Sequence, residues 1–213
     1  MQRYRVSKGD AITTKPDPPI VPFASRGAWE AWLEGQHTTS EGLWLKIAKK
    51  RSGIETVSYD EAVEVALCYG WIDGQARGFD EDHYLTRFTP RRPRSRWSKV
   101  NRKKAKELIK RGKMKAAGLR EVERAKADGR WDAAYDAPST AAVPDDLRRE
   151  LEKNEKAREF FSELDARNRY AILYQIQDAK RPETRARRIA KYAAMLAEQK
   201  KPYRSTRTPP GPS

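Results

Sequence analysis

The first third of the chain carries both helical and strand-like patterns of apolar positions. In RGAWEAWLEGQ, Trp29 and Leu33 lie four residues apart on one aromatic face, which predicts a helix. Ser25 precedes this segment and has the side chain of a good N-cap. In SYDEAVEVALCYG, Ser58 and Glu61 have the spacing of a capping box, so we expect a second helix to begin there.

Strand periodicity lies between and after these helices. In GLWLKIAKK, the residues Leu43, Leu45 and Ile47 fall on one side of an extended chain, which predicts a strand. The segment WIDGQARGF contains Asp73-Gly74 and Gly78, which are turn signals, so we expect short strands around a turn. HYLTRF is expected to form the next strand.

Helical patterns dominate from Ser98 onward. Ser98 is expected to cap a helix that continues through Arg111 and ends at Gly112, and a second helix is expected over residues 117–128. Every apolar pattern beyond Pro144 has a helical period. The predicted N-caps of these last helices are Asp145, Asn154 and Asp165.

These patterns predict an α+β fold, in which helices and a small sheet form the N-terminal half and helices alone form the C-terminal half. Proline-rich, polar stretches at both ends are interpreted as flexible segments. The predicted organisation is a leader at 1–22, an α+β domain at 23–130, a linker at 131–144, a helical region at 145–199 and a tail at 200–213.

Positive charge is concentrated in one part of the chain. The chain of 213 residues has a formal net charge of +15, and the segment 87–113 holds thirteen basic residues against one acid, Glu107. A second basic stretch, residues 180–207, holds ten basic residues against two acids, and the remaining sequence is slightly acidic. Such asymmetry favours a directed contact with an anionic partner, either a nucleic acid or an acidic protein.

The prolines of PRRPRSRW favour an extended arginine-rich stretch that can follow a phosphate backbone. Trp97 is expected to stack on a base or on an arginine. The alternative is that these cations form solvated faces and internal salt bridges, with Trp97 in the core. The predicted anion-binding or nucleic-acid-binding residues are Arg91, Arg92, Arg94, Arg96, Trp97, Lys99, Arg102 and Lys103.

A second basic ridge lies near the C-terminus. Arg181, Arg185 and Arg188 recur with helical spacing, opposite the apolar face of the predicted helix. This ridge is either a second anchor for the same anionic partner or a set of side chains satisfied by Glu183 and other nearby acids.

Catalytic chemistry is weakly represented. Trp71, Asp73 and Gln75 combine aromatic and polar groups as a small-ligand pocket does, although Asp73 also suits a turn. Cys68 has no histidine at a motif spacing, and its place on the apolar stripe favours a structural role. The acidic run Asp80–His83 is expected to be an exposed loop. We expect no catalytic residue, no metal site and no cofactor.

Several long stretches resemble one bacterial family. FASRGAWEAWLE, GLWLKIAKKRSGI, SYDEAVEVALCYGWIDGQ, RFTPRRPRSRWSKVNRKKAKELI and YAILYQIQDAKRPETRARRIAKYAAML are similar to the YdeI/OmpD-associated, or bacteriocin-protection, proteins over about residues 23–199. The resemblance implies a role in envelope stress or antimicrobial-peptide resistance and a link to an outer-membrane porin. It implies no enzymatic activity and no cofactor.

The N-terminal sequence lacks the apolar run of a signal peptide, and no stretch approaches the roughly 20 apolar residues that span a bilayer. We therefore expect a cytoplasmic protein without a transmembrane helix, although some family members are thought to be periplasmic. The leading hypothesis is a non-enzymatic protein of the bacteriocin-protection type that works through a basic anion-binding surface. The alternatives are a nucleic-acid-binding protein and a small-molecule binder or enzyme with a pocket near Trp71 and Asp73.

Overall fold

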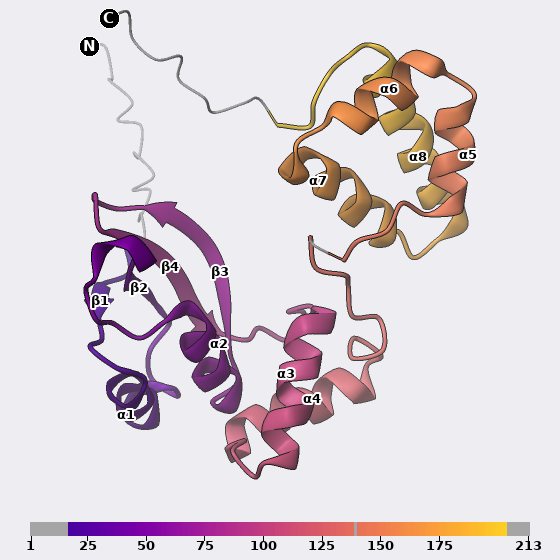
Figure 1. Ribbon diagram of the computed structural model, residues 1–213. Coiled ribbons are helices and arrows are strands. Elements are labelled where there is room, and N and C mark those ends of the chain that lie inside the picture. Colours follow the sequence, from indigo (N-terminus) through magenta and orange to yellow (C-terminus); the bar gives the residue numbers. More distant parts are fainter. Residues whose placement is uncertain (1–16, 139, 204–213) are drawn as a thin grey trace, which may run out of the picture. The chain divides into compact units, whose positions relative to one another are not determined.

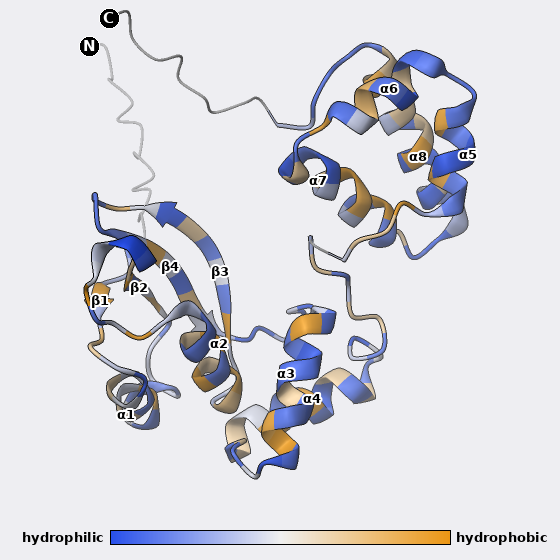
Figure 2. Ribbon diagram, in the orientation of Figure 1, coloured by the Kyte–Doolittle hydropathy of each residue, from blue (hydrophilic) through white to orange (hydrophobic). Residues whose placement is uncertain are grey.

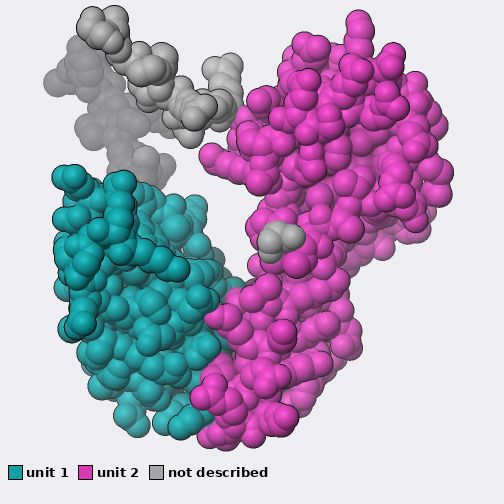
Figure 3. Space-filling view, viewed as in Figure 1, with its two compact units in different colours: residues 1–93, 113–120 teal, residues 94–112, 121–213 magenta. Residues whose placement is uncertain are grey.

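The computed structural model describes residues 17–138 and 140–203. The chain forms two compact units, shown in different colours in Figure 3. The first unit comprises the described residues up to Pro93 together with Lys113–Arg120, and the second comprises Arg94–Gly112 and the described residues from Glu121 onward. These units differ from the predicted boundaries at residues 130 and 145, because the chain leaves the first unit at Pro93 and returns to it once.

The first unit is built on a four-stranded sheet with the order β1-β2-β4-β3 (Figure 1). Its strands are β1 (Ile20–Pro22), β2 (Leu43–Ala48), β3 (Trp71–Gly78) and β4 (His83–Pro90). β1 pairs parallel to β2, and the other pairs are antiparallel. The predicted leader therefore ends before residue 20, since three of its residues pair with β2, and its first sixteen residues lie outside the described part.

One face of this sheet is covered by α1 (Arg26–Gln36) and α2 (Tyr59–Cys68). Trp29 is fully buried and meets the rings of Phe88 and Trp71 edge-on, with ring centres 5.6 and 6.2 Å apart. Trp29 also donates its indole N–H to the carbonyl of Ala62 at 3.1 Å. α1 is thus fixed to both the sheet and α2 by one aromatic side chain.

Both helices of the first unit begin as their sequences predict. The Ser25 hydroxyl accepts a hydrogen bond from the Ala28 amide at the start of α1. The capping box between Ser58 and Glu61 is present at the start of α2. Each cap satisfies amides that otherwise lack partners in the first turn of a helix.

Neither α1 nor α2 lies on the opposite face of the sheet. Strand register places Trp44 beside Arg87 and Lys46 beside Leu85 on this face, and Arg77 of β3 pairs with the same Leu85. We call this the open face, because α1 and α2 do not cover it, and define it by Trp44, Lys46, Arg77, Leu85, Arg87 and Thr89. Trp44 and Leu85 are buried within it, at 8% and 1% exposure.

A β-bulge in β3 decides which residues reach the open face. The register shifts between Asp73 and Ala76, so that Gly74 and Gln75 both lie opposite one residue of β4. Strict alternation from Asp73 would place Arg77 on the helix-covered face, and the extra residue turns it to the open face. The predicted turn at Asp73-Gly74 is therefore wrong: both residues lie inside one eight-residue strand.

The second unit is helical. It contains α3 (Lys99–Lys110), most of α4 (Ala116–Ala127), α5 (Asp145–Glu152), α6 (Glu155–Glu163), α7 (Ala166–Gln177) and α8 (Pro182–Ala197). The last four helices share a core of buried apolar residues that includes Leu147, Phe161, Ile172 and Leu196, and Figure 2 shows orange segments on all four. The predicted α+β class, with a sheet in the N-terminal half and helices in the C-terminal half, is confirmed.

Caps in the second unit agree with the sequence at three of four positions. Ser98, Asn154 and Asp165 accept amide hydrogen bonds at the starts of α3, α6 and α7. The N-cap of α5 is Pro144, so Asp145 lies one residue inside the helix. An aspartate in the first turn still interacts favourably with the positive end of the helix dipole, which explains its position.

The predicted linker at 131–144 begins with packed residues. Trp131 is 5% exposed, and Tyr135 forms a bridge with Ser98 through two backbone hydrogen bonds. The composition of the segment, rich in alanine and proline, does not indicate these contacts, which involve residues more than thirty positions earlier. The first residues of the predicted linker therefore pack within the second unit.

Candidate anion-binding groove

The predicted basic segment is divided between the two units. Arg91 and Arg92 belong to the first unit, and the residues from Arg94 to Lys103 belong to the second. The site is therefore described for each unit separately.

In the second unit, three of the predicted cations have partners within the protein. Arg96 forms a salt bridge of 2.6 Å with Asp178, Lys99 one of 2.6 Å with Asp136, and Arg102 donates to the carbonyl of Trp131 at 2.9 Å. These side chains hold distant segments of the unit together. The alternative of internal salt bridges accounts for them better than a free basic surface does.

Trp97 is also a structural residue. Its side chain is 1% exposed and packs edge-on against Trp131, with ring centres 4.9 Å apart. A ring in this position is not accessible to a nucleobase, so the expected base-stacking role does not fit the structure. Arg94 and Lys103, by contrast, are exposed, as are Lys106 and Lys110 on the same helix as Lys103.

The first unit contains a groove of about 940 Å³ at the end of the sheet. Arg91 and Arg92 line it, together with a third arginine, Arg87 on β4. Arg91 is 6% exposed and is held in place by its backbone, whose N–H donates to the carbonyl of Gly70 at 3.0 Å. The other lining residues are Asp17, Pro18, Pro19, Ser40, Glu41, Gly42, Thr89, Pro90 and Pro93.

Arg87 is not among the binding residues that the sequence predicts. Its Nη1 atom is buried and has no hydrogen-bond acceptor among the described residues. Burial lowers the pKa of Arg87, while the carboxylates of Asp17 and Glu41 act in the opposite direction and Arg92 lowers it further. A guanidinium donor without an acceptor costs free energy when it is buried, and an oxyanion beside it would recover part of that cost.

The groove is not uniformly basic, because its three arginines face two carboxylates, Asp17 and Glu41. Hydroxyl groups of Ser40 and Thr89 add neutral donors to the wall. This mixture suits an anion that is recognised by several directed hydrogen bonds rather than by a large excess of charge.

The second basic ridge is used mainly within the protein. Arg185 binds both carboxylate oxygens of Asp146, at 2.6 and 2.9 Å, and also donates to the carbonyl of Ile176. Arg188 donates to the carbonyl of Gln175 and lies 3.4 Å from Asp178. Arg181 is exposed at the N-terminus of α8. Two of the three arginines thus join α8 to other helices.

We expect the pKa of the Asp146 carboxyl to lie below its ordinary value of 3.8, because hydrogen bonds from Arg185 stabilise its charged form. A lowered pKa in the folded state means that the pair stabilises the fold above about pH 4 and ceases to do so as pH falls through the lowered pKa. NMR titration of Asp146 checks this. The substitution Arg185→Gln should raise the midpoint, Arg187→Gln on the same helix should not, and a midpoint at or above 3.8 in the unchanged protein would contradict the expectation.

The three residues proposed for a small-ligand pocket do not gather around a cavity. Trp71 is 1% exposed, and its indole N–H donates to the carbonyl of His37 at 3.1 Å. Asp73 accepts a hydrogen bond of 2.7 Å from the Tyr59 hydroxyl, and Gln75 is exposed in the β-bulge. Burial, followed by the charge and hydrogen bond of Asp73, raises the pKa of Tyr59 far above its ordinary value. None of the three lines either pocket described here.

The remaining candidates for chemistry are structural. Cys68 is buried, and burial raises the pKa of its thiol to about 11, so the thiolate that a nucleophile needs is scarce near neutral pH. Asp80 would have its pKa raised by desolvation, but hydrogen bonds from His83, the Asp82 amide and Lys46 outweigh this and lower it to about 2. In the described part of the chain, no group of three potential ligands is placed to hold a metal ion.

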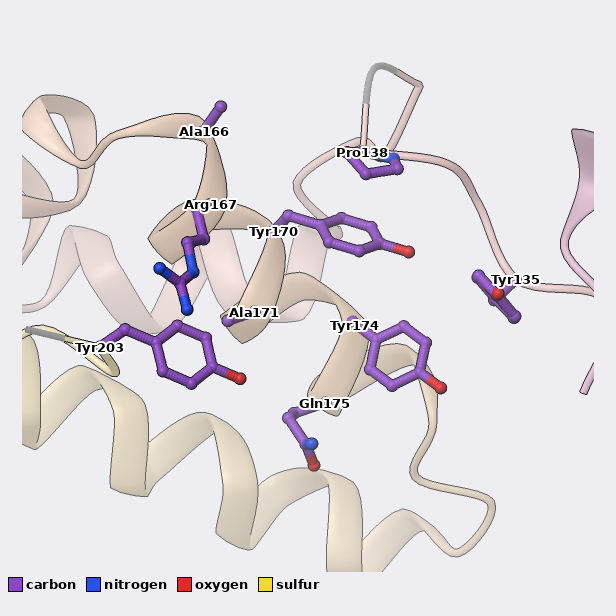
Figure 4. A pocket seen from close by; sticks show the side chains of 9 residues that line it. All are labelled: Tyr135, Pro138, Ala166, Arg167, Tyr170, Ala171, Tyr174, Gln175 and Tyr203. Atoms are coloured by element: carbon purple, nitrogen blue, oxygen red, sulfur yellow. The ribbon is translucent and has the colours of Figure 1, made fainter. Parts of the chain in front are cut away.

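A separate pocket of about 550 Å³ lies in the second unit (Figure 4). Four tyrosines line it: Tyr135, Tyr170, Tyr174 and Tyr203. The guanidinium of Arg96 lies 5.1 Å from the ring centre of Tyr135 and 4.8 Å from that of Tyr174, and Arg167 lies 4.8 Å from that of Tyr203. Three of the four rings, those of Tyr135, Tyr174 and Tyr203, are thus already paired with an arginine.

Comparison with known families gives one match in each half of the chain. Residues 140–199 match the family described as Bacteriocin-protection, YdeI or OmpD-Associated, which confirms the predicted resemblance over that segment. Residues 21–121 match a different family, described as a domain of unknown function (DUF8412). No match was found among curated proteins or among solved structures. None of the helices described by the structure is long and apolar enough to cross a membrane.

Proposed function

We propose that the protein is a non-enzymatic binding protein that holds an oxyanion-bearing partner in the groove of its first unit. The observation that carries this proposal is Arg87, which lines the groove and whose buried Nη1 donor has no acceptor in the part of the chain that the structure describes. Arg91 and Arg92 lie at the same groove, so that an oxyanion there can receive charge-assisted hydrogen bonds from more than one side chain.

We further propose that this binding serves the protective role named in the family matched by residues 140–199. A protein with a formal net charge of +15 repels cationic antimicrobial peptides rather than binding them. Protection through direct capture of such peptides is therefore disfavoured. Binding to an anionic component of the bacterial cell, which the peptides would otherwise meet, agrees better with the charge.

Titration with inorganic polyphosphate at about 50 and about 200 mM salt tests the groove, because these salt concentrations bracket the range in which phosphate contacts lose affinity steeply. The substitution Arg92→Glu reverses one exposed charge in the groove, and Arg51→Glu reverses one exposed charge of the same unit outside it. We expect the first to weaken binding about tenfold or more, in line with the loss of a charged hydrogen bond, and the second to change it about threefold or less.

Equal effects of the two reversals would overturn the groove as the site. Absence of binding to polyphosphate at the lower salt would overturn the proposal that the first unit holds oxyanions. Thermal unfolding of both variants shows whether each still folds. We expect both to fold, because both substituted positions are exposed.

A further inference from the structure

We infer that the anionic partner is a single-stranded nucleic acid, which lies along the open face of the sheet and places a phosphate in the groove. This inference rests on the proposed function of the groove and names the class of partner. It uses residues of the open face that the anion-binding proposal does not need.

The open face offers planar groups on which bases can stack. The Arg77 guanidinium lies 4.4 Å from the ring centre of Trp44, and the Arg87 guanidinium lies 6.0 Å from it. Phe79, which follows β3, is 48% exposed and has the Lys46 ammonium 4.9 Å from its ring centre. Bases of single strands stack on aromatic rings and on guanidinium planes, and neighbouring cations pair with the phosphates between them.

The open face and the groove are continuous through β4. Arg87 and Thr89 belong to the open face by strand register, and both also line the groove. The eight residues of β4 extend over roughly 25 Å at the usual rise of a strand. This path is long enough for several nucleotides, whose bases would lie over the sheet while the backbone continues to Arg91 and Arg92.

Charge is distributed unequally between the two sides of the first unit. The helices α1 and α2 carry one arginine, Arg26, against five carboxylates: Glu30, Glu34, Asp60, Glu61 and Glu64. The open face carries Lys46, Arg77 and Arg87. Asp80 lies 3.4 Å from Lys46 at the far end of that face. An anionic polymer is therefore repelled from the helix side and attracted to the sheet side.

A single strand fits this surface better than a duplex or an acidic peptide does. A duplex hides the faces of its bases, so the guanidinium planes and Phe79 would find nothing to stack on. An acidic peptide would use the cations but gain nothing from flat stacking groups. Only an unpaired strand combines phosphates with accessible aromatic faces at each repeat.

Fluorescence anisotropy with a labelled single-stranded oligopyrimidine of about twelve nucleotides tests the inference, since that length lies within the usual range for single-strand sites. The matched probes are an abasic strand with the same phosphates, a hairpin duplex and poly-glutamate. We expect the oligopyrimidine to bind about tenfold or more tightly than the abasic strand, because each stacked base raises the affinity about fivefold or more. Equal affinity for these two strands, or tighter binding of the duplex or of poly-glutamate, would overturn the inference.

The variants Phe79→Ala and Ile54→Ala form a matched pair, because both remove an exposed apolar side chain from the first unit, 48% and 45% exposed respectively. We expect Phe79→Ala to weaken oligopyrimidine binding at least fivefold, the lower limit for one stacked base, and to leave polyphosphate binding unchanged. Ile54→Ala should change neither. An unchanged oligopyrimidine affinity in Phe79→Ala would contradict stacking at that ring.

The two proposals fail in different ways. If polyphosphate binds and Arg92→Glu weakens it, while the abasic and normal strands bind equally, the groove proposal holds and the nucleic-acid inference is wrong. If neither polyphosphate nor the oligopyrimidine binds at the lower salt, both are wrong.

Discussion

Replacing Trp29 with alanine is expected to lower the free energy of unfolding of the first unit by about 3–5 kcal/mol, the usual loss for a large buried aromatic residue. Trp29 is fully buried, and its ring contacts those of Phe23, Trp32, Trp71 and Phe88. Its removal leaves a cavity between α1 and the sheet and removes the indole hydrogen bond to the carbonyl of Ala62. Since a folded domain is usually stable by only about 5–15 kcal/mol, the loss is a large share of the total.

Denaturant unfolding followed by circular dichroism measures this effect. Trp32→Ala is the control, because Trp32 lies on the same helix and stacks on Trp29 at 5.4 Å but is only partly buried. We expect the control to lose clearly less stability. If Trp29→Ala lowered the free energy of unfolding by less than about 1 kcal/mol, neighbouring side chains would have filled the cavity. The aromatic cluster would then not be the main contact that holds α1 on the sheet.

Gly118→Ala is expected to destabilise the protein by about 1–3 kcal/mol, the usual cost of overpacking. Gly118 lies in α4, where replacing glycine by alanine normally adds up to about 1 kcal/mol of helix stability. Here a Cβ atom would lie 2.4 Å from the carbonyl oxygen of Cys68 and 2.5 Å from that of Leu67. Both contacts are with backbone atoms at the end of α2, which cannot move aside as a side chain can.

Gly35→Ala is expected to have the opposite effect on protein stability. Gly35 lies in α1, and a Cβ atom there would meet nothing within 4 Å. We expect this variant to be more stable by about 0.5–1 kcal/mol, because alanine restricts the unfolded chain. Thermal unfolding of the two variants side by side checks the pair. A stabilised Gly118→Ala would show that α4 does not approach α2 as closely as described.

The helices of this protein were predictable because their signals are local. Ser25, Ser58 and Ser98 each cap a helix within three residues of themselves, and the apolar residues that follow repeat with the period of a helix. Such patterns depend on neighbours in the sequence, which the sequence shows directly. The alternating segment that became β2 was predictable for the same reason.

The partners of the basic residues were not predictable because they come from distant positions. Arg96 meets Asp178, Lys99 meets Asp136 and Arg185 meets Asp146, all more than thirty residues away along the chain. A run of cations in the sequence therefore gave no indication of which ones remained available.

Arg87 was not predicted as a binding residue, but the structure places it in the groove. It stands slightly before the densest part of the basic run, in a segment that the sequence presents as an ordinary strand. Its importance comes from the register that places it beside Trp44 and from the groove that meets the end of β4. Neither of these can be deduced from local spacing.

The bulge at Gly74 and Gln75 has a consequence for how related chains should be aligned. It absorbs one residue more than the pairing with β4 requires. A chain that lacks either residue would pair regularly and would still turn the equivalent of Arg77 to the open face. A one-residue gap at this position is therefore neutral for the surface, whereas the same gap in β4, which has no spare residue, would exchange the two faces of the strand. Length variation among relatives should be tolerated in β3 at this one place and should be rare in β4.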